Sequence, residues 1–392
     1  MFRDTNKKIT ILKNIGALIS GNIEQPVIQG DAILIRDRVI SKIGRFNNLD
    51  AKGASLIDCM GTTVTPGLID SHCHPILGDY TSRQKQADFI DSGVHGGVTT
   101  VISAGEVHLP GRPKDPGGVK ALAILAAKSF ANFRPGGAKV RGGAVILEKG
   151  LVEADFKEMA QQGVSLVGEI GLGSIKDPAE ANTMVGWARK NGMKIMMHTG
   201  GASIPGSSTV TAAMVMEADP DIASHVNGGP TALHFEEVKK LVTDTKMAIE
   251  IVHCGNGMVA VQTGKFCSEK DQLHRIIIGN DAPSGTGVIP LGILRTINLL
   301  ASMTPITGAQ AICMATGNTA RVHNLDTGII EPGRPADLVI MDKPIGSVGA
   351  TALKAIEAGD IPGIGMVLVD GRIVAGKSRN TPPAATQPER LE

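Results

Sequence analysis

The stretch VTPGLIDSHCH, residues 64–74, is an apolar, strand-like run that ends in two histidines spaced two residues apart. Side chains alternate between the two faces of a β-strand, so His72 and His74 point the same way while Cys73 points away. Two neutral imidazoles side by side at a strand end can begin a metal site. The pair alone is a weak signal, so the other ligands must come from elsewhere in the chain.

The composition favours a large fold whose partner is a small neutral substrate or a small anion. A chain of 392 residues with 42% hydrophobic content exceeds what one core usually serves, which predicts one large and one smaller domain. The formal net charge of +1 and the lack of dense Lys/Arg runs argue against a nucleic-acid partner and against an anionic membrane surface.

The sequence shows neither a targeting segment nor a cysteine spacing typical of disulfides. No stretch approaches the ~18 apolar residues of a membrane helix, and residues 1–14 lack the apolar segment of a leader. The five cysteines show neither framework spacing nor a CxxC motif. We therefore expect a cytoplasmic protein with reduced cysteines.

Both ends of the chain are rich in short strands. The first ~60 residues contain strand patterns, and so does the far end, where Asp370-Gly371 marks a hairpin turn. A small composite β-sandwich built from residues 1–63 and 328–392, with an extended C-terminal tail, is predicted. The expected strands are 9–12, 31–35 and 39–43 near the start, and 336–341, 366–369 and 372–375 near the end.

The middle of the chain alternates apolar runs with helical stretches such as 236–242, which favours βα units around a parallel sheet. An open doubly wound sheet is the competing architecture, but no GxGxxG fingerprint follows the first strand. We predict an α/β fold in which residues 64–327 form a (β/α)8 TIM barrel. The expected barrel strands are 63–70, 99–103, 140–147, 165–170, 194–197, 222–224, 248–252 and 275–278.

Residues that can bind metal lie in or after several of these runs. Barrel enzymes place their sites at the carboxyl ends of the strands, so these side chains should converge on one rim. The candidate metal ligands are His72, His74, Glu169, His198, His225 and Asp281.

Glu169 is the most diagnostic candidate, because it interrupts the apolar run 164–171. A core-facing charge there would cost several kcal/mol unless it were paired or bound to metal, and one carboxylate can place an oxygen on each of two cations. The other ligands have structural alternatives: His198 as a hydrogen-bonded core histidine, His225 as part of an Asn-Gly turn, and Asp281 as a helix N-cap.

Two further residues are weaker candidates. Lys149 follows the third strand and could be a carboxylated bridge, but a solvated turn lysine is the favoured interpretation. His253, on the seventh strand, is expected to pack near the site or support it rather than bind metal.

The chain resembles the amidohydrolase superfamily in PGLIDSHCH (66–74), GVTT (97–100) and GRPADL (333–338). Within that superfamily it is similar to the enamidases of bacterial nicotinate fermentation over nearly its whole length. The distinctive runs are HGGVTTVISAG (95–105), GGAVILEKGL (142–151), MHTGGASIPGSSTVTA (197–212) and GNDAPSGTGVIPLGILR (279–295).

This resemblance implies a binuclear centre bridged by glutamate, where many relatives use a carboxylated lysine. Carried over, it assigns one divalent metal ion to His72, His74 and Asp281, the second to His198 and His225, and the bridge to Glu169. It implies zinc and iron, or two zinc ions, and a homotetramer. The mixed nitrogen and oxygen ligands suit either metal.

The resemblance also implies the reaction, which is hydrolysis of 1,4,5,6-tetrahydro-6-oxonicotinate to 2-formylglutarate and ammonia. A hydroxide bridging the two metals would attack the amide, and Asp281 would carry the proton to the leaving nitrogen. The substrate carboxylate needs a cation, and the loop at 199–203 offers further polar groups. The candidate substrate-binding residues are Arg83, Lys85, Arg112, Lys114, Thr199 and Ser203.

Several other functions compete with this one. A dihydroorotase-like or hydantoinase-like cyclic amidase, or an isoaspartyl dipeptidase, would be expected to have lysine at position 169. A mononuclear deaminase would need a glutamate downstream of His198, where Thr199-Gly200-Gly201 stands. A non-catalytic scaffold of the same fold would be expected to have lost ligands.

Overall fold

The computed structural model describes residues 9–77, 86–228, 232–283, 287 and 289–391. Contacts between Cα atoms divide the described residues into two compact units. One unit consists of the described residues within Met1–Ile69, Ser92–Thr99 and Ile297–Glu392, and the other of those within Asp70–Asp91 and Thr100–Thr296. The domain boundaries expected from sequence stay a prediction.

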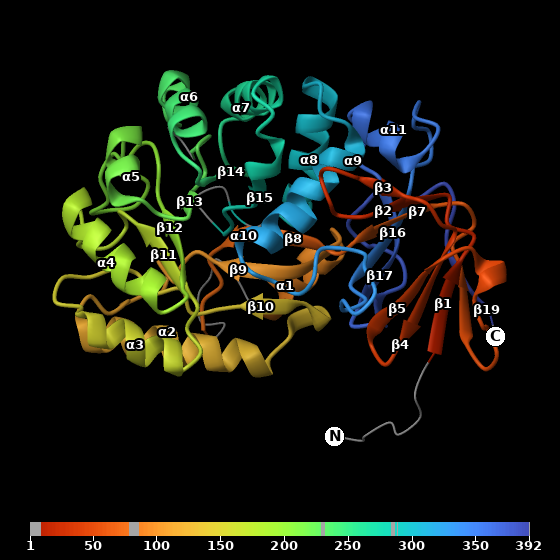
Figure 1. Ribbon diagram of the computed structural model, residues 1–392, viewed down its shortest axis with the longest axis horizontal. Coiled ribbons are helices and arrows are strands. Elements are labelled where there is room, and N and C mark those ends of the chain that lie inside the picture. The colour runs from red at the N-terminus through yellow and green to blue at the C-terminus, as the bar shows by residue number, and fades with distance from the viewer. Residues whose placement is uncertain (1–8, 78–85, 229–231, 284–286, 288, 392) are drawn as a thin grey trace. The chain divides into compact units, whose positions relative to one another are not determined.

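The first unit contains two β-sheets whose strands come from both ends of the chain, as the sequence pattern indicates (Figure 1). One sheet has the order β19 (Glu389–Leu391), β6 (Ser55–Asp58), β1 (Ile9–Lys13), β4 (Ala32–Arg36) and β5 (Val39–Gly44). The other has the order β18 (Arg372–Ala375), β17 (Gly363–Val369), β16 (Leu338–Asp342), β7 (Thr63–Pro66), β2 (Ala17–Ile19) and β3 (Val27–Ile28).

Turn chemistry sets the hairpins of this unit. Asp37 and Arg38, between β4 and β5, both have positive φ, and so do Asp370 and Gly371 between β17 and β18. Two central residues with positive φ form the hairpin turn that matches the twist of antiparallel strands. The hairpin that the sequence predicts at Asp370-Gly371 is therefore confirmed, and the expected strands 31–35 and 39–43 pair as a second hairpin.

A common apolar core lies between the two sheets, which makes the unit a β-sandwich. The core takes side chains from β1, β4, β16 and β17, such as Leu12, Ile33, Ile340 and Leu368, all 0% exposed. The helices that lie wholly within this unit are η1 (Phe46–Asn48), α9 (Gly308–Cys313), a π-helical turn (Met314–Asn318), α10 (Thr319–Val322) and α11 (Ala352–Glu357).

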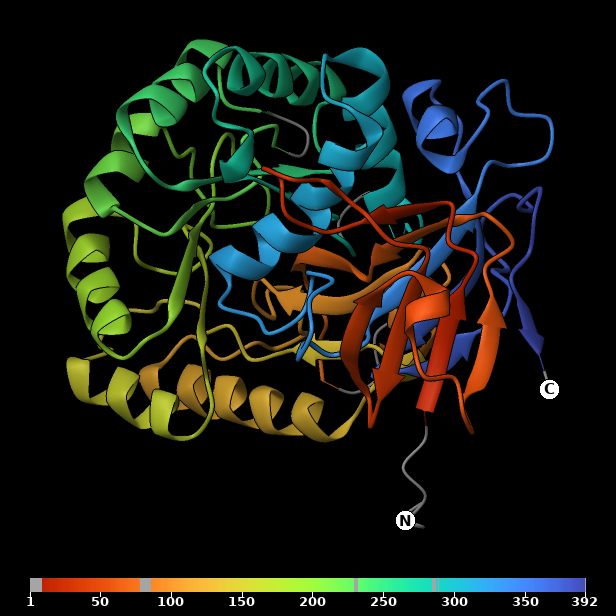
Figure 2. The same cartoon turned by 45° about the vertical axis from the view of Figure 1, so that its right-hand side comes forward.

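Parallel strands and helices alternate through the middle of the chain and form a barrel, with the helices outside (Figures 1 and 2). The strands are β8 (Leu68–Cys73), β9 (Val98–Ser103), β10 (Lys139–Arg141), β11 (Leu166–Ile170), β12 (Lys194–Met197), β13 (Ile222–Ala223), β14 (Ala248–Val252) and β15 (Ile276–Gly279). The helices are α1 (Gln86–Val94), α2 (Pro116–Asn132), α3 (Glu153–Gln161), α4 (Pro178–Lys190), α5 (Ala212–Ala218), α6 (Phe235–Asp244), α7 (Gly257–Glu269) and α8 (Gly292–Met303), with short η2 (Pro135–Gly137) and η3 (Leu273–Arg275).

Two parallel bridges close the barrel. Val145 pairs with Val167 and so joins the β8–β10 sheet to the β11–β15 sheet at one edge. Cys73 pairs with Ala282 at the other edge. The (β/α)8 architecture is thereby confirmed against the open doubly wound alternative. No described helix combines the length and the apolar character that a bilayer crossing requires.

Two predicted strands differ from the structure. The expected run 63–70 is divided between β7 of the sandwich and β8 of the barrel. Gly67 lies at the division, where an added Cβ would approach Thr99 Oγ1 to 2.1 Å. The run 140–147 ends early as β10, because Gly143 has a φ of +82° and packs against the backbone of α2. Apolar content does not reveal such breaks.

Candidate metal centre

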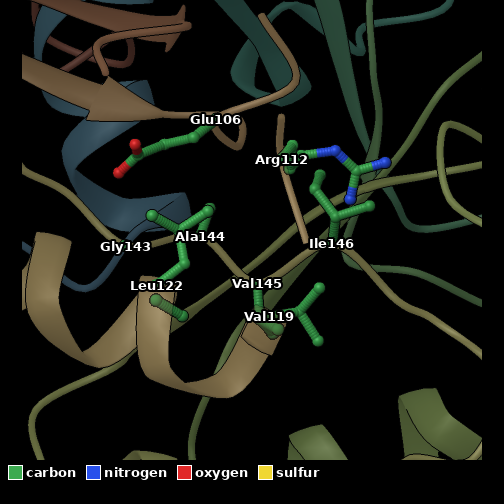
Figure 3. A pocket seen from close by; sticks show the side chains of 9 residues that line it. Glu106, Arg112, Val119, Leu122, Gly143, Ala144, Val145 and Ile146 are labelled. Carbon is green, nitrogen blue, oxygen red and sulfur yellow. The ribbon is translucent and has the colours of Figure 1, made fainter. Parts of the chain in front are cut away.

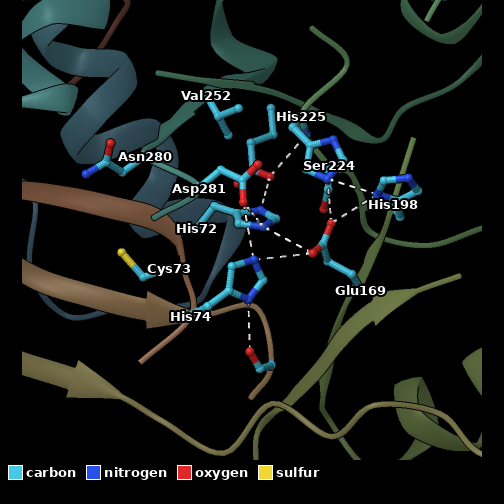
Figure 4. A network of polar contacts seen from close by, with 12 residues as sticks. His72, Cys73, His74, Glu169, His198, Ser224, His225, Val252, Asn280 and Asp281 are labelled. Carbon is cyan, nitrogen blue, oxygen red and sulfur yellow. Dashed lines mark hydrogen bonds and ion pairs between the residues drawn. The ribbon is translucent and has the colours of Figure 1, made fainter. Parts of the chain in front are cut away.

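Imidazole and carboxylate side chains from separate strands converge at one end of the barrel (Figure 4). Each lies in or just after its strand, at the carboxyl end where barrel enzymes build their sites. Asp281 keeps 14% of its side chain exposed, and the other five side chains are at most 4% exposed. The group consists of His72 and His74 from β8, Glu169 from β11, His198 after β12, His225 after β13 and Asp281 after β15.

One carboxylate oxygen of Glu169 faces the two histidines of β8. Its Oε2 lies 3.4 Å from His72 Nε2 and 3.5 Å from His74 Nε2. Asp281 lies on the same side, with Oδ1 3.2 Å from His74 Nε2 and 3.7 Å from His72 Nε2. Ligand atoms of His72, His74 and Asp281 all lie within 4.8 Å of one another, a spacing that suits one divalent cation.

The second oxygen of Glu169 faces a different pair of imidazoles. Its Oε1 lies 2.5 Å from His225 Nε2 and 3.6 Å from His198 Nδ1. The two imidazole nitrogens are themselves 3.2 Å apart. Each oxygen of one carboxylate therefore serves its own ligand pair, which is the geometry that a carboxylate bridging two cations requires.

Hydrogen bonds on the outer ring nitrogens orient the imidazoles. His74 Nδ1 lies 2.9 Å from the carbonyl oxygen of Gly105, and His198 Nε2 lies 2.8 Å from that of Gly201. A carbonyl accepts only from a protonated ring nitrogen, so each ring presents its other nitrogen, unprotonated in the neutral form, to the centre. Such outer partners fix the tautomer of metal-ligating histidines.

Glu250, on β14, supports His72 in the same way and was missed by the sequence analysis. It is 0% exposed, and its Oε2 lies 2.7 Å from His72 Nδ1. The same oxygen accepts from the backbone N–H of His225, while Oε1 accepts from the hydroxyl of Ser71. The signal was present, because Glu250 interrupts the apolar run AIEIV as Glu169 interrupts its own run.

The backbone around the ligands is strained and is held by another buried carboxylate. His225 and Asp281 have φ values of +33° and +57°, which cost a non-glycine residue on the order of 1–3 kcal/mol. Asp70 Oδ1 accepts hydrogen bonds from the backbone N–H groups of His72 and Asn280. These bonds connect β8 to the segment that carries Asp281.

The electrostatics of the cluster fit a bound cation. Burial favours a raised pKa for Glu169, but His72 and His225 hold that pKa well below its usual range. Burial opposes charge on His72 too, yet Glu250 and Glu169 raise its pKa well above the ordinary value. His72 Nε2 is buried and makes no hydrogen bond within the described part of the chain. Divalent cations would supply the positive charge that the carboxylates demand.

The expected substrate-binding cations have different placements. Arg83 and Lys85 lie outside the described residues. Arg112 is paired with Glu148 at 3.0 Å, with 8% and 2% of the two side chains exposed, so its charge is already compensated. Lys114 is exposed and lines a groove beside the site.

The polar loop after β12 also differs from expectation in one residue. Thr199 is 0% exposed, and its hydroxyl donates to the backbone carbonyl of Ser224, so its proton serves the fold. Ser203 is exposed and lines the same groove as Lys114. The sequence of a hydroxyl-rich loop does not reveal which of its hydroxyls face the candidate site.

The two weaker candidates lie where the sequence analysis expects them. Lys149 is exposed in the turn after β10, and its backbone N–H donates to Ser174 Oγ. His253 follows β14 and is partly buried, and burial together with the positive charge of Arg295 lowers its pKa.

The model of the amidohydrolase family matches residues 63–374. The chain belongs to this family. It is 58% identical to the enamidase of Eubacterium barkeri over 376 residues, covering 96% of this chain and 97% of the relative. A crystal structure of enamidase superposes with a TM-score of 0.95 at 57% identity, covering 98% of this chain and 100% of the other.

A more distant amidohydrolase-like barrel shows the fold alone. The β-aspartyl dipeptidase of Fervidobacterium islandicum AW-1 has a TM-score of 0.67 at 18% identity, covering 94% of this chain and 98% of that one. Members of the amidohydrolase family typically bind divalent metals, and the ligand groups described above are of the required type.

Replacing the bridge should empty the centre. Metal analysis after equilibrium dialysis should find about two divalent ions per wild-type chain and a sharp loss in Glu169→Ala, because both ion positions lose an oxygen ligand. Glu269→Ala, an exposed position at the end of α7, is the matched control and should retain the metal. Full occupancy in Glu169→Ala would exclude the bridging role.

Weakening the support of His72 should lower metal affinity without removing a ligand. Glu250→Gln keeps the shape but loses the charge behind His72, and loss of such a partner typically costs about 10- to 100-fold in affinity. Competition with a chelator measures the effect, and circular dichroism checks the fold. Unchanged affinity in a folded variant would contradict the role assigned to Glu250.

Glu106, after β9, should make stability depend on pH. It lies over a hollow lined by Ala144 and Ile146 (Figure 3) and is 3% exposed. Its Oε2 accepts from the backbone N–H of Leu77, while Oε1 makes no hydrogen bond to any described residue. Burial raises its pKa from 4.5 to about 7.

Between about pH 4.5 and pH 7, the folded state therefore keeps a proton on Glu106 that the unfolded state releases. The contribution of this group to the free energy of unfolding thus falls as pH rises through that range. Glu106→Gln should remove that dependence and be more stable than wild type at pH 8, by on the order of 3 kcal/mol. Urea unfolding at pH 4.5 and pH 8 measures the difference. Parallel pH profiles for the two proteins would show the prediction to be wrong.

Proposed function

We propose that this chain is a metal-dependent cyclic amidase that hydrolyses 1,4,5,6-tetrahydro-6-oxonicotinate to 2-formylglutarate and ammonia. The observation that carries the proposal is the position of Glu169 between two imidazole pairs, in a chain 58% identical to an enamidase along nearly its full length. A glutamate there distinguishes this centre from those that the resemblance associates with a carboxylated lysine.

The centre would hold two divalent ions, zinc and iron or two zinc ions, since mixed imidazole and carboxylate ligands suit both metals. His72, His74 and Asp281 would bind one ion, His198 and His225 the other, and Glu169 both. When bound, such a pair supplies a water of lowered pKa and polarises the amide carbonyl.

Asp281 is the proposed proton carrier. Burial alone favours a raised pKa, but the close contact with His74 Nε2 and the charge of His72 hold the pKa of Asp281 below its ordinary value. It is thus ionised at neutral pH and ready to accept a proton from the attacking water. Its partly exposed carboxylate can then give that proton to the departing ring nitrogen.

Opening the ring breaks the amide bond and leaves an enamine. The enamine tautomerises to an imine, and a second water releases ammonia and the aldehyde. The overall balance is one cyclic amide and two waters in, and one formyl dicarboxylic acid and one ammonia out.

The likeness to enamidase also supports a homotetrameric enzyme of the cytoplasm. None of the five cysteines forms a disulfide in this fold, which suits a reducing compartment.

The decisive experiment supplies the metal-loaded protein with 1,4,5,6-tetrahydro-6-oxonicotinate and measures ammonia and aldehyde. Both should appear, while dihydroorotate and hydantoin should be poor substrates. Turnover of either of these two, with none of the cyclic enamide, would replace this proposal with a dihydroorotase-like or hydantoinase-like activity.

Asp281→Asn should lower kcat by about 10²- to 10⁴-fold, the usual contribution of a positioned proton carrier. Asp271→Asn is the matched control, because Asp271 has a similar φ of +56° but is exposed and precedes β15, whereas Asp281 follows that strand. Metal content is measured for both variants, so loss of proton transfer can be told from loss of a ligand.

A further inference from the structure

A groove of about 760 Å³ opens beside the candidate metal centre, within the same unit of the chain. Its walls are loops that follow the strands β9 to β12 and include His108, Leu172 and Ser203. The ring of His108 meets the ring of His74 edge to face, with 5.2 Å between centroids. His108 therefore connects the lining of the groove to the ligand cluster.

The groove carries an excess of positive charge. Its described lining contains three cationic side chains and a single carboxylate, that of Glu148. The carboxylate of Glu148 forms an ion pair with Arg112 at 3.0 Å and accepts a hydrogen bond from the backbone N–H of Ser174 at 2.9 Å. Lys114 and Lys176 are left to balance the charge of an occupant.

Lys176 is the better placed of the two lysines. It is partly buried, whereas Lys114 is exposed. Its ammonium donates one hydrogen bond, 2.6 Å long, to the carbonyl oxygen of Gly171, two residues beyond Glu169. An ammonium has three donors, so two remain for a bound anion. An ion pair in partly desolvated surroundings is stronger than one at the open surface.

The loop that carries Lys176 is held on both sides. Ser174 donates to Glu148 ahead of it, and Asp177 caps α4 behind it by accepting from the backbone N–H of Glu180. Gly173 packs so tightly that an added Cβ would lie 2.0 Å from the carbonyl oxygen of Leu147. The loop therefore holds the backbone of Lys176 in place, which lowers the entropy cost when its ammonium binds an anion.

We propose that Lys176, with Lys114 as an outer partner, binds the carboxylate of the substrate and makes the enzyme select anionic cyclic amides over neutral ones. The proposal rests on the cyclic amidase function and adds the group that distinguishes among its substrates. Arg112, the cation expected from sequence, acts instead as a structural tie between loops.

Steady-state kinetics on a matched pair of substrates test this assignment. The pair is 1,4,5,6-tetrahydro-6-oxonicotinate and its neutral carboxamide, which differ only in charge. Lys176→Met should raise KM for the acid by about 10- to 100-fold, the usual range for a charged hydrogen bond, with kcat nearly unchanged. KM for the carboxamide should stay the same, and Lys176→Arg should restore most of the affinity for the acid.

Lys157→Met, an exposed position on α3, controls for a general loss of charge and should behave as wild type. An equal rise in KM for both substrates would show that Lys176 merely maintains the loop, and no change would show that another group binds the carboxylate. Either result overturns the assignment while leaving the amidase function intact.

Binding can be tested apart from turnover. Calorimetric titration with 6-oxo-1,6-dihydropyridine-3-carboxylate, whose aromatic ring resists hydrolysis, should give a weaker Kd for Lys176→Met than for wild type. Its carboxamide should bind the two proteins equally. If the wild type hydrolyses no cyclic amide yet shows this difference, the amidase function fails and Lys176 remains the carboxylate receptor.

Discussion

The interaction on which the rest of the site depends is the shared carboxylate of Glu169. A buried carboxylate without compensation would cost several kcal/mol, and here each oxygen faces its own pair of imidazoles. This charge can stay in the barrel only while the imidazoles, or cations between them, surround it. The arrangement therefore ties β11 to β8 on one side and to the ends of β12 and β13 on the other.

A ring of buried acceptors keeps those imidazoles in place. Glu250 orients His72, backbone carbonyls orient His74 and His198, and Asp70 secures the backbone next to Asp281. None of these acceptors needs to touch a substrate. These acceptors keep the candidate ligands in place although the backbone of Asp281 has a strained left-handed conformation. A flexible loop would relax that strain. The proposed carboxylate receptor, Lys176, lies apart from these acceptors, in a groove formed by loops.

Strand-end chemistry was predictable because a parallel barrel brings the carboxyl ends of its strands to one rim whatever the loops do. A histidine or carboxylate that ends an apolar run therefore has little freedom in where it lies. No comparable rule predicts which side chains pair with one another. No local pattern distinguishes Arg112 from a free cation, because its partner Glu148 is 36 residues away, and none singles out Lys176 among the other lysines.

The barrel, the composite sandwich and the set of candidate ligands were predictable from the chain alone, because hydrophobic period and residue type are local properties. Three-dimensional packing was needed to show that Glu169 lies between two pairs, that Glu250 supports His72, and that the run 63–70 divides at Gly67. Those facts depend on distances across the barrel between residues far apart in the chain. Such distances follow from packing, which no single segment encodes.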